Sequence, residues 1–176
     1  MKRFWALCLI MATLILIDQF SKGYIQTTMF YGQTIPVIKG LFSIAYVKNM
    51  GAAFGFGSEG PLWFRQLFFL GLPVIFCGWI FFQLVKTIKG PLHMSVAYAL
   101  IIAGAIGNLI DRFSLGYVVD FIMFYWKEEV NHFPAFNVAD SCITIAAGLL
   151  IIDFFLQLKA KKNEEVTNAS DTISKS

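Results

Sequence analysis

Two aspartates in apolar surroundings are the residues of this chain best suited to acid–base chemistry. Asp120 lies in the apolar stretch 116–121, and Asp140 lies in the stretch 136–141. If the chain folds so that these carboxyl groups meet, one must keep a proton, because like charges at close range do not both ionise. The carboxylate would then activate a water molecule, and the carboxylic acid would donate a proton to a scissile amide.

A purely structural explanation of the same two aspartates is also open. Asp140 precedes a long apolar stretch, where a carboxylate can cap the start of a helix. Asp120 could form an ion pair with Arg112. The spacing of these residues fixes no geometry, so composition alone leaves both explanations standing.

Further polar and charged residues gather near the two aspartates. Asn108, Asp111 and Arg112 are spaced i, i+3 and i+4, so they share one helix face. Arg112 would either orient a substrate carbonyl or keep a carboxylate ionised, and an interhelical polar clamp explains the pattern equally well. Asp18 and Lys22 follow an earlier apolar stretch. Because charges at membrane depth are costly without a partner, such a cluster indicates function.

Glycines mark places where segments of backbone can approach each other closely. We expect Gly104, Gly107 and Gly116 to permit close helix packing. Residues 49–57 form a glycine-rich segment after a strand-like run, but neither a lysine nor a helix start follows directly, which argues against a phosphate-binding loop. A backbone cradle for an extended peptide and an ordinary hairpin connection are both open explanations.

The composition assigns the chain to the membrane proteins. Of its 176 residues, 57% are hydrophobic and 14% are charged, whereas a soluble domain has roughly 45–50% apolar and about 25% charged residues. Apolar stretches near the length of about 20 residues that a spanning helix needs predict an all-α membrane fold with four transmembrane helices. We expect these spans at about residues 4–24, 61–85, 92–110 and 136–158.

The basic residues predict the orientation of these spans. Those with almost no acidic neighbours are Lys2, Arg3, Lys86, Lys89, Lys159, Lys161 and Lys162. They fall on one side of the predicted spans, which indicates that both termini are cytoplasmic.

The segments between the spans complete the predicted organisation. Residues 23–60 and 113–135 would lie outside the cell membrane, and residues 35–48 have a strand-and-turn composition. Residues 1–162 would form a single integral membrane domain, and the polar residues 163–176 are expected to form a disordered cytoplasmic tail.

Asp153 is the carboxylate that lies deepest toward the cytoplasmic side. It follows Asp140 by thirteen residues, which is a rotation of about 220° around a helix and turns it away from that residue. We therefore interpret Asp153 as an end-of-helix carboxylate near Lys159 and not as part of a catalytic pair.

Other chemistries fit the sequence poorly. It contains neither H-E-x-x-H nor G-x-S-x-G, and His93 and His132 are predicted on opposite sides of the membrane, so a zinc hydrolase has little support. Cys8, Cys77 and Cys142 are odd in number and far apart, which favours neither a disulfide framework nor a metal site. The basic residues form no aromatic-lined stripe, so no nucleic-acid partner is expected.

Five motifs occur in order along nearly the whole chain. They are Asp18-Gln19 with Lys22, Asn49 with Gly51-Ala52-Ala53-Phe54-Gly55, Gly104-Ala105-Ile106-Gly107-Asn108 with Asp111-Arg112, Val118-Val119-Asp120-Phe121, and Phe136-Asn137-Val138-Ala139-Asp140-Ser141. In this combination the chain resembles the lipoprotein signal peptidases, also called signal peptidase II. One departure is Ala103, where that family often has a further glycine.

The resemblance implies a membrane aspartyl endopeptidase of the bacterial cytoplasmic membrane. Such an enzyme removes the signal peptide from diacylglyceryl-modified prolipoproteins by cleaving before the lipidated cysteine, at the extracytoplasmic face. By this likeness Asp120 and Asp140 are the catalytic pair, and neither a metal nor an organic cofactor is needed. It assigns substrate binding to Asn49, Gly51, Asn108, Arg112 and Asn137, and support of the site to Asp18, Lys22, Gly104 and Asp111.

The resemblance also implies a small extracytoplasmic β cradle formed by about residues 35–56. Membrane lipid, diacylated prolipoproteins and inhibitors of the globomycin type are the expected partners. A small proton- or ion-coupled carrier is the alternative function, because intramembrane charges also form relays. A carrier usually has ionisable groups at the midplane of repeated halves, whereas here they are predicted at one face of a chain without repeats.

Overall fold

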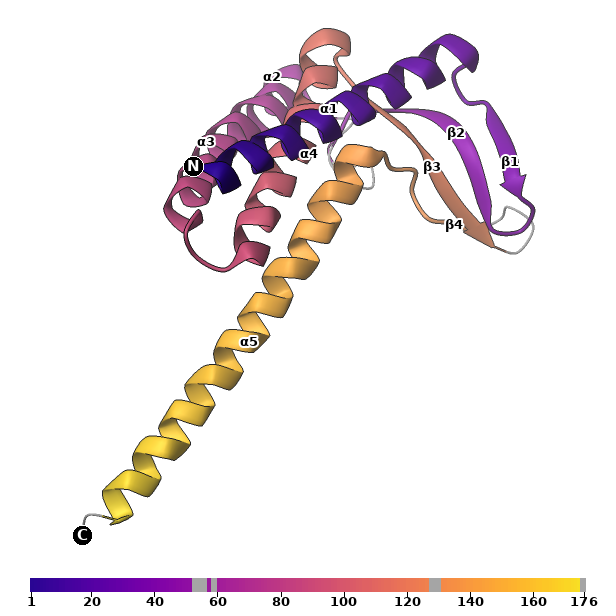
Figure 1. Ribbon diagram of the computed structural model, residues 1–176. Helices are drawn as coiled ribbons and strands as arrows, with labels where there is room; N and C mark the ends of the chain where they lie inside the picture. The colour runs from indigo at the N-terminus through magenta and orange to yellow at the C-terminus, as the bar shows by residue number, and fades with distance from the viewer. Residues whose placement is uncertain (52–56, 58–59, 127–130, 175–176) are drawn as a thin grey trace.

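The computed structural model describes residues 1–51, 57, 60–126 and 131–174 (Figure 1). Among these residues, four helices are long and apolar enough to cross a membrane. They are Lys2–Thr28, Leu62–Thr87, Leu92–Leu115 and Val138–Asn163. The predicted membrane fold with four spanning helices is therefore confirmed, with ends that differ from the expected ones by a few residues.

The second span is continuous but locally widened. It consists of α2 (Leu62–Gln66), the π-helical turn η2 (Leu67–Gly71) and α3 (Leu72–Thr87). Pro73 lies at the start of α3 and has no N–H to donate to the carbonyl of Phe69, which explains why the regular pattern of hydrogen bonds changes here.

Helix α4 (Leu92–Leu115) is the central helix of the bundle. Half of the residues in its most apolar 18-residue stretch are buried inside the protein. In the corresponding stretches of the other three spans only 11–17% of the residues are buried. It ends at Gly116, whose φ of 80° lies in the left-handed region that favours glycine. No atom lies within 4 Å of a Cβ built at Gly116, so its predicted role in close helix packing is wrong, and the helix end explains the residue instead.

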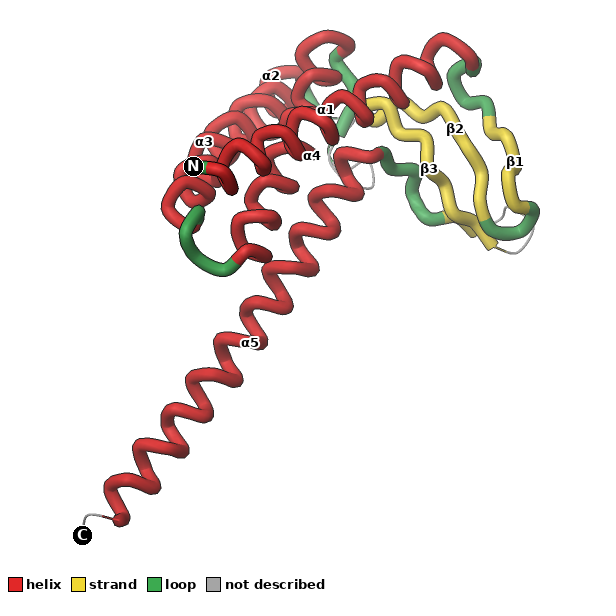
Figure 2. The backbone as a smooth tube through the Cα atoms, viewed as in Figure 1, coloured by secondary structure: helices red, strands yellow, loops and turns green. Residues whose placement is uncertain are grey.

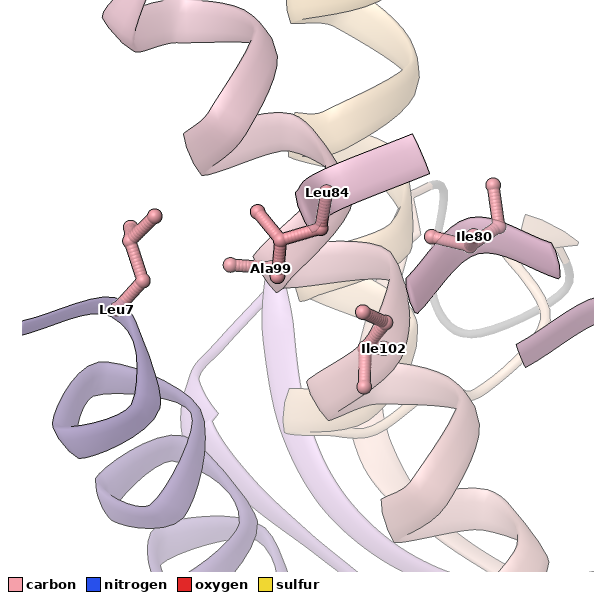
Figure 3. Close-up of a cluster of buried hydrophobic side chains, with 5 residues drawn as sticks. All are labelled: Leu7, Ile80, Leu84, Ala99 and Ile102. Atoms are coloured by element: carbon pink, nitrogen blue, oxygen red, sulfur yellow. The ribbon is translucent and has the colours of Figure 1, made fainter. Parts of the chain in front are cut away.

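A buried apolar cluster joins α4 to two neighbouring helices. Leu7 comes from α1 (Lys2–Thr28), which packs across α4, and the other members come from α3 and α4 (Figure 3). Its members are Leu7, Ile80, Leu84, Ala99 and Ile102. In a membrane such contacts act through close van der Waals packing, and this cluster holds together the part of the bundle that includes the N-terminal part of α1.

An antiparallel sheet lies beside the far end of α1 (Figure 2). Its strands are β1 (Thr34–Ile38), β2 (Phe42–Asn49), β3 (Val118–Trp126) and β4 (Asn131–His132), in that spatial order. The strand-and-turn composition of residues 35–48 is thereby confirmed as the β1–β2 hairpin.

Strand β3 was not predicted, and it changes the setting of Asp120. The sequence placed this aspartate in the segment 113–135 between two spans and predicted no strand there, but Asp120 is the third residue of β3 and lies opposite Val47 of β2. The strand is almost fully buried around it, because Val119 and Phe121 pack with residues of α1 in a second apolar cluster. A strand holds its backbone far more rigidly than a loop does.

Helix α5 (Val138–Ser174) begins beside the sheet and extends well past the rest of the bundle (Figure 1). The helix continues into the segment 163–176, for which a disordered tail is expected from the sequence, and it ends at Ser174. Neither glycine nor proline occurs after Gly148, and Lys, Ala and Glu residues between 159 and 165 favour continuation of the helix.

Candidate active site

The fold brings Asp120 and Asp140 to one site from two different elements. Asp120 lies on β3 and is 2% exposed, and Asp140 lies in the first turn of α5. Asn137, which is fully buried, links them: its Nδ2 donates to Asp120 Oδ1 at 2.7 Å, and its backbone N–H donates to Asp140 Oδ2 at 3.2 Å. The two carboxyl groups thus share one asparagine as a neighbour.

The same asparagine also caps α5. Asn137 Oδ1 accepts the backbone N–H of Asp140 at 2.9 Å while Asp140 accepts the N–H of Asn137, which is the reciprocal pattern of a capping box. Asn137 is therefore the N-cap, and Asp140 contributes to the helix start as the residue that binds back to it, which is only part of what the structural explanation required. In the part of the chain that the structure describes, however, no ion pair joins Asp120 to Arg112, so the other half of that explanation is wrong.

Asn108 of α4 connects the aspartates to a buried lysine. Its Nδ2 donates to Asp140 Oδ1 at 2.7 Å, and its Oδ1 accepts from Asn137 Nδ2 at 3.1 Å and from Lys22 Nζ at 3.0 Å. The amide orientation is fixed by this network, because a flipped amide would face Lys22 with a donor.

Lys22 is 1% exposed and finds a partner for each of its three ammonium hydrogens. Besides Asn108, it contacts Asp18 Oδ2 at 2.8 Å and Asp111 Oδ2 at 3.1 Å. A buried charge is tolerated only when it is paired and hydrogen-bonded, and here the two carboxylates meet that requirement. The lysine thereby joins α1 to α4.

The two carboxylates that surround Lys22 also bind the backbone next to the candidate catalytic residues. Asp111 Oδ2 accepts the N–H of Val119 at 3.0 Å, and Asp18 Oδ1 accepts the N–H of Ala139 at 2.9 Å. Val119 directly precedes Asp120, and Ala139 directly precedes Asp140. One buried cluster therefore positions both β3 and the start of α5.

Gln19 belongs to this cluster and was not singled out as a site residue. Its Nε2 donates to Asp111 Oδ1 at 2.9 Å and to the Gly107 carbonyl at 3.0 Å. The motif Asp18-Gln19 was noted in the sequence, but helical spacing from Lys22 gave no reason to include the glutamine. The sequence could have indicated Gln19, because it is a polar residue close to two charged residues of the same helix, Asp18 and Lys22.

Two glycines of α4 permit this close approach, as predicted. A Cβ at Gly104 would lie 2.4 Å from the Ala139 carbonyl oxygen, and a Cβ at Gly107 would lie 2.6 Å from Asp18 Oδ2. Real Cβ atoms do not approach other atoms so closely, so any side chain at either position would displace α5 or α1.

Asn49 of β2 and Arg112 of α4 contact the site and the segment that follows β2. Asn49 Nδ2 donates to Asp120 Oδ2 at 3.0 Å, and its Oδ1 accepts the N–H of Gly51 at 3.0 Å. Arg112 Nη2 donates to the Gly51 carbonyl at 2.8 Å, and its guanidinium lies 5.9 Å from the centre of the Phe69 ring. The rest of the expected cradle, residues 52–56, lies outside the described residues.

A cavity of about 1040 Å³ opens beside these groups. Its polar lining includes Asn49, Asn108, Arg112, Asp120 and Asp140, and side chains of α3, α4 and α5 make the rest mostly apolar. Sites for small or extended ligands are typically apolar cavities with a few convergent polar groups. Ser141 also lines the cavity.

Burial and a neighbouring charge alter the acidity of Asp120. Desolvation and, after it, the nearby Asp140 raise the pKa of Asp120 to about 7, while hydrogen bonds from Asn49 and Asn137 and the charge of Lys22 act in the opposite direction. A carboxyl group with this pKa exists in both protonation states near neutral pH, as acid–base catalysis requires.

Asp153 lies outside this site, as its helical phase predicted, but its partner differs from the expected one. Its Oδ1 is 2.6 Å from His93 Nε2, and its Oδ2 accepts from Gln157 Nε2 at 2.5 Å. Lys159 is exposed and is not its partner. Within the described ranges, no three His, Cys, Asp or Glu residues are grouped in a way that could bind a metal ion.

Four helices of spanning length with a small antiparallel sheet define a polytopic membrane protein, and the comparisons with known proteins specify which kind. The signal peptidase (SPase) II family, Peptidase_A8, matches residues 10–156. The chain belongs to this family of peptidases.

Individual relatives agree with the family assignment. The chain is 43% identical to a lipoprotein signal peptidase of Syntrophus aciditrophicus (strain SB), over 92% of this chain and 99% of the relative. It is 44% identical to a lipoprotein signal peptidase of Acinetobacter baumannii (strain SDF), over 86% and 84% of the two chains. The alternative of a small carrier receives no support from these relatives.

Solved structures give the same result for the fold. A bacterial membrane enzyme determined by the in meso method at 2.3 Å resolution superposes with a TM-score of 0.74 at 36% identity, over 89% of this chain and 91% of that one. A second such enzyme, at 1.9 Å resolution, gives a TM-score of 0.69 at 34% identity, over 85% and 92%.

Proposed function

We propose that this chain is an aspartyl endopeptidase that removes the signal peptide of prolipoproteins, with Asp120 and Asp140 as the catalytic pair. The observation that carries the proposal is the link through Asn137, which joins the two carboxyl groups beside a largely apolar cavity. The names of the relatives, lipoprotein signal peptidases, support the choice of substrate.

The chemistry follows from the shared proton of the pair. Near neutral pH the ionised carboxyl removes a proton from water, whose oxygen attacks the carbonyl carbon of the scissile amide. The neutral carboxyl protonates the carbonyl oxygen as the tetrahedral intermediate forms. When that intermediate collapses, the C–N bond breaks, and the amine nitrogen takes the proton that the first carboxyl removed from water. One hydroxyl of the intermediate returns its proton to the second carboxyl, which restores the pair. Asn108 and Asn137 keep both carboxyl groups in place throughout.

Arg112 is well placed to orient the substrate. It lines the cavity, and its Nε is buried without a hydrogen-bond partner in the part of the chain that the structure describes. A buried donor without a partner is costly unless a ligand accepts from it. We expect a backbone carbonyl of the signal peptide to do so, with Asn49 and Gly51 beside it.

The apolar lining supports a lipid-modified substrate. Phe68, Leu72 and Phe76 of the second span and Ile143 of α5 belong to the apolar lining of the cavity. The acyl chains of such a substrate already lie in the membrane, so an apolar lining lets them extend from the lipid to the site without covering buried polar groups. Globomycin-type inhibitors are expected to compete for the same cavity.

The orientation of the chain in the bacterial cytoplasmic membrane is part of the proposal. Arg3 donates to the carbonyls of Ile88 and Gly90 at 2.9 and 2.7 Å, so the N-terminus and the connection that carries Lys86 and Lys89 lie at the same end of the bundle. Together with the positive-inside rule, this contact supports cytoplasmic termini and a site at the extracytoplasmic face.

Cleavage of a defined substrate tests this function. The purified protein in detergent is given a prolipoprotein whose cysteine carries diacylglycerol, and the same prolipoprotein without the lipid. We expect cleavage just before the lipidated cysteine, detected as two products by mass spectrometry, and little cleavage of the unmodified chain. Equal cleavage of both substrates would contradict the lipid requirement, and cleavage of neither would contradict the function.

A further inference from the structure

Arg65 contacts two segments that lead to the candidate catalytic residue, although the site described above does not include it. It is a half-buried residue of α2. Its Nε donates to the Met50 carbonyl at 3.2 Å, and its Nη2 donates to the Gly116 carbonyl at 3.3 Å. One planar guanidinium therefore links the end of β2 to the residue that terminates α4.

These two carbonyls lie just beyond the last pair of the β2–β3 ladder. Asn49 pairs with Val118 at that end of the ladder, Met50 follows Asn49, and Gly116 precedes β3 by two residues. The end of a strand pair frays unless its backbone finds other partners. Arg65 provides such a link across the two strands, at the position where Asn49 approaches Asp120.

A second arginine acts on the neighbouring carbonyl. Arg112 donates to the Gly51 carbonyl at 2.8 Å, so successive carbonyls after Asn49 are bound by guanidinium groups from α2 and α4. Asn49 itself is fixed at both ends of its side chain, to Gly51 N–H and to Asp120 Oδ2, each at 3.0 Å. The backbone position of residues 50 and 51 thereby determines where the Asn49 amide lies.

We propose that Arg65 is a positioning residue for the cleavage reaction: by linking Met50 to Gly116, it keeps the Asn49 amide hydrogen-bonded to Asp120. This inference rests on the proposed function, because it assigns a role within that reaction. Arg65 itself has no contact with either aspartate among the described residues.

The acidity of Asp120 provides a readout that a merely structural role would not change. The groups that face Asp120 are Asp140 of α5 and Lys22 of α1, together with the amides of Asn49 and Asn137, and Arg112 of α4 lies within electrostatic range. The Asn49 hydrogen bond lowers the pKa of Asp120, so its loss raises that pKa. Displacement of Asn49 should therefore move the alkaline limb of the activity profile upward.

The test compares Arg65→Gln and Arg65→Lys with wild type in detergent, using the diacylated prolipoprotein. For Arg65→Gln we expect kcat/KM to fall roughly tenfold and the alkaline midpoint to rise by about half a pH unit. Arg65→Lys should lie between Arg65→Gln and wild type, because an ammonium group replaces only part of the guanidinium fork. Thermal unfolding of each variant, followed in the same detergent, confirms that it is folded.

Arg3→Gln is the matched control, because Arg3 also donates to two backbone carbonyls but at the opposite end of the bundle. It should leave the pH profile unchanged. Wild-type rate and midpoint in Arg65→Gln would overturn the inference, as would a lower rate with an unchanged midpoint. Absence of cleavage by the wild-type protein would instead contradict the proposed function, so the two failures are distinguishable.

Discussion

Asn137 donates a 2.7 Å hydrogen bond to Asp120 while its own backbone N–H is bound by Asp140. This side chain has two separable tasks, since its oxygen caps α5 and its nitrogen binds Asp120. The geometry of the candidate catalytic pair is therefore coupled to the formation of a helix end. A substitution that preserves the cap but removes the donor distinguishes the two tasks.

Asn137→Ser should provide that distinction. Serine accepts the N–H of Asp140 as a good N-cap but has no amide to reach Asp120. We expect thermal stability near that of wild type and a roughly 10- to 100-fold loss of kcat, because hydrogen bonds to charged groups contribute about 1.5–3 kcal/mol. Asn137→Ala should lose activity and also about 1 kcal/mol of stability. Wild-type kcat in Asn137→Ser would show that the Asp120 contact is unimportant.

Lys22→Met should destabilise the protein strongly. The substitution leaves Asp18 and Asp111 buried without their cation, and breaking a buried ion pair costs about 3–5 kcal/mol. The thermal midpoint in detergent measures the effect. The triple variant Asp18→Asn, Lys22→Met, Asp111→Asn removes all three charges and should recover part of the loss. A Lys22→Met midpoint equal to wild type would contradict the account of this cluster.

Gly104→Ala should disrupt the contact between α4 and α5. The added methyl group would lie 2.4 Å from the Ala139 carbonyl oxygen, which is backbone and cannot move without shifting the turn that carries Asp140. Overpacking of this kind costs about 1–3 kcal/mol, and activity should fall with stability. Gly148→Ala is the control: nothing lies within 4 Å of a Cβ there, so it should be neutral or slightly stabilising. Equal behaviour of the two variants would refute this packing argument.

Activity should decline as the pH rises through about 7, because the pair then loses the proton that its neutral carboxyl donates. The stability of the native state should also fall as the pH rises. The native pKa of Asp120 is about 7 and that of an unfolded aspartate is about 3.9, so the native state binds more protons between these values and loses stability as pH rises across that window.

A variant tests the cause of this pH dependence. Asn49→Ala removes a hydrogen bond that lowers the pKa of Asp120, so the alkaline midpoint of kcat/KM should move upward. The profile is measured from about pH 5 to pH 9 with the diacylated substrate. A midpoint that moves downward, or an alkaline limb that is absent from wild type, would contradict the assignment to Asp120.

Much of the fold follows from elementary patterns in the sequence. Apolar stretches of spanning length predicted the helices, and β-branched residues around Pro36 and Gly40 predicted the β1–β2 hairpin. The helical phase of Asp153 correctly separated it from Asp140, because a regular helix converts sequence spacing into direction.

Long-range pairing could not be obtained in this way. From the sequence alone, strand β3 cannot be distinguished from an apolar loop. Its pairing with β2, and the register of that pairing, depend on tertiary contacts. The partner of Asp153 was assigned to a neighbour in sequence, Lys159, whereas His93 comes from another helix. Likewise, the sequence grouped Asp18 and Lys22 with Asp111 as charges near the aspartates, but it could not show that one lysine would lie between both carboxylates.

The most direct test of the central claim is cleavage of the diacylated prolipoprotein by Asp120→Asn and Asp140→Asn, with Asp153→Asn as the matched control. An amide is nearly isosteric with the carboxyl group but cannot act as a general acid or base near neutral pH, so each of the first two variants should lose roughly 10²- to 10⁴-fold in kcat while remaining folded. Asp153→Asn should cleave at close to the wild-type rate, because Asp153 contacts His93 and lies outside the cavity. Cleavage near the wild-type rate by folded Asp120→Asn or Asp140→Asn would contradict the catalytic pair.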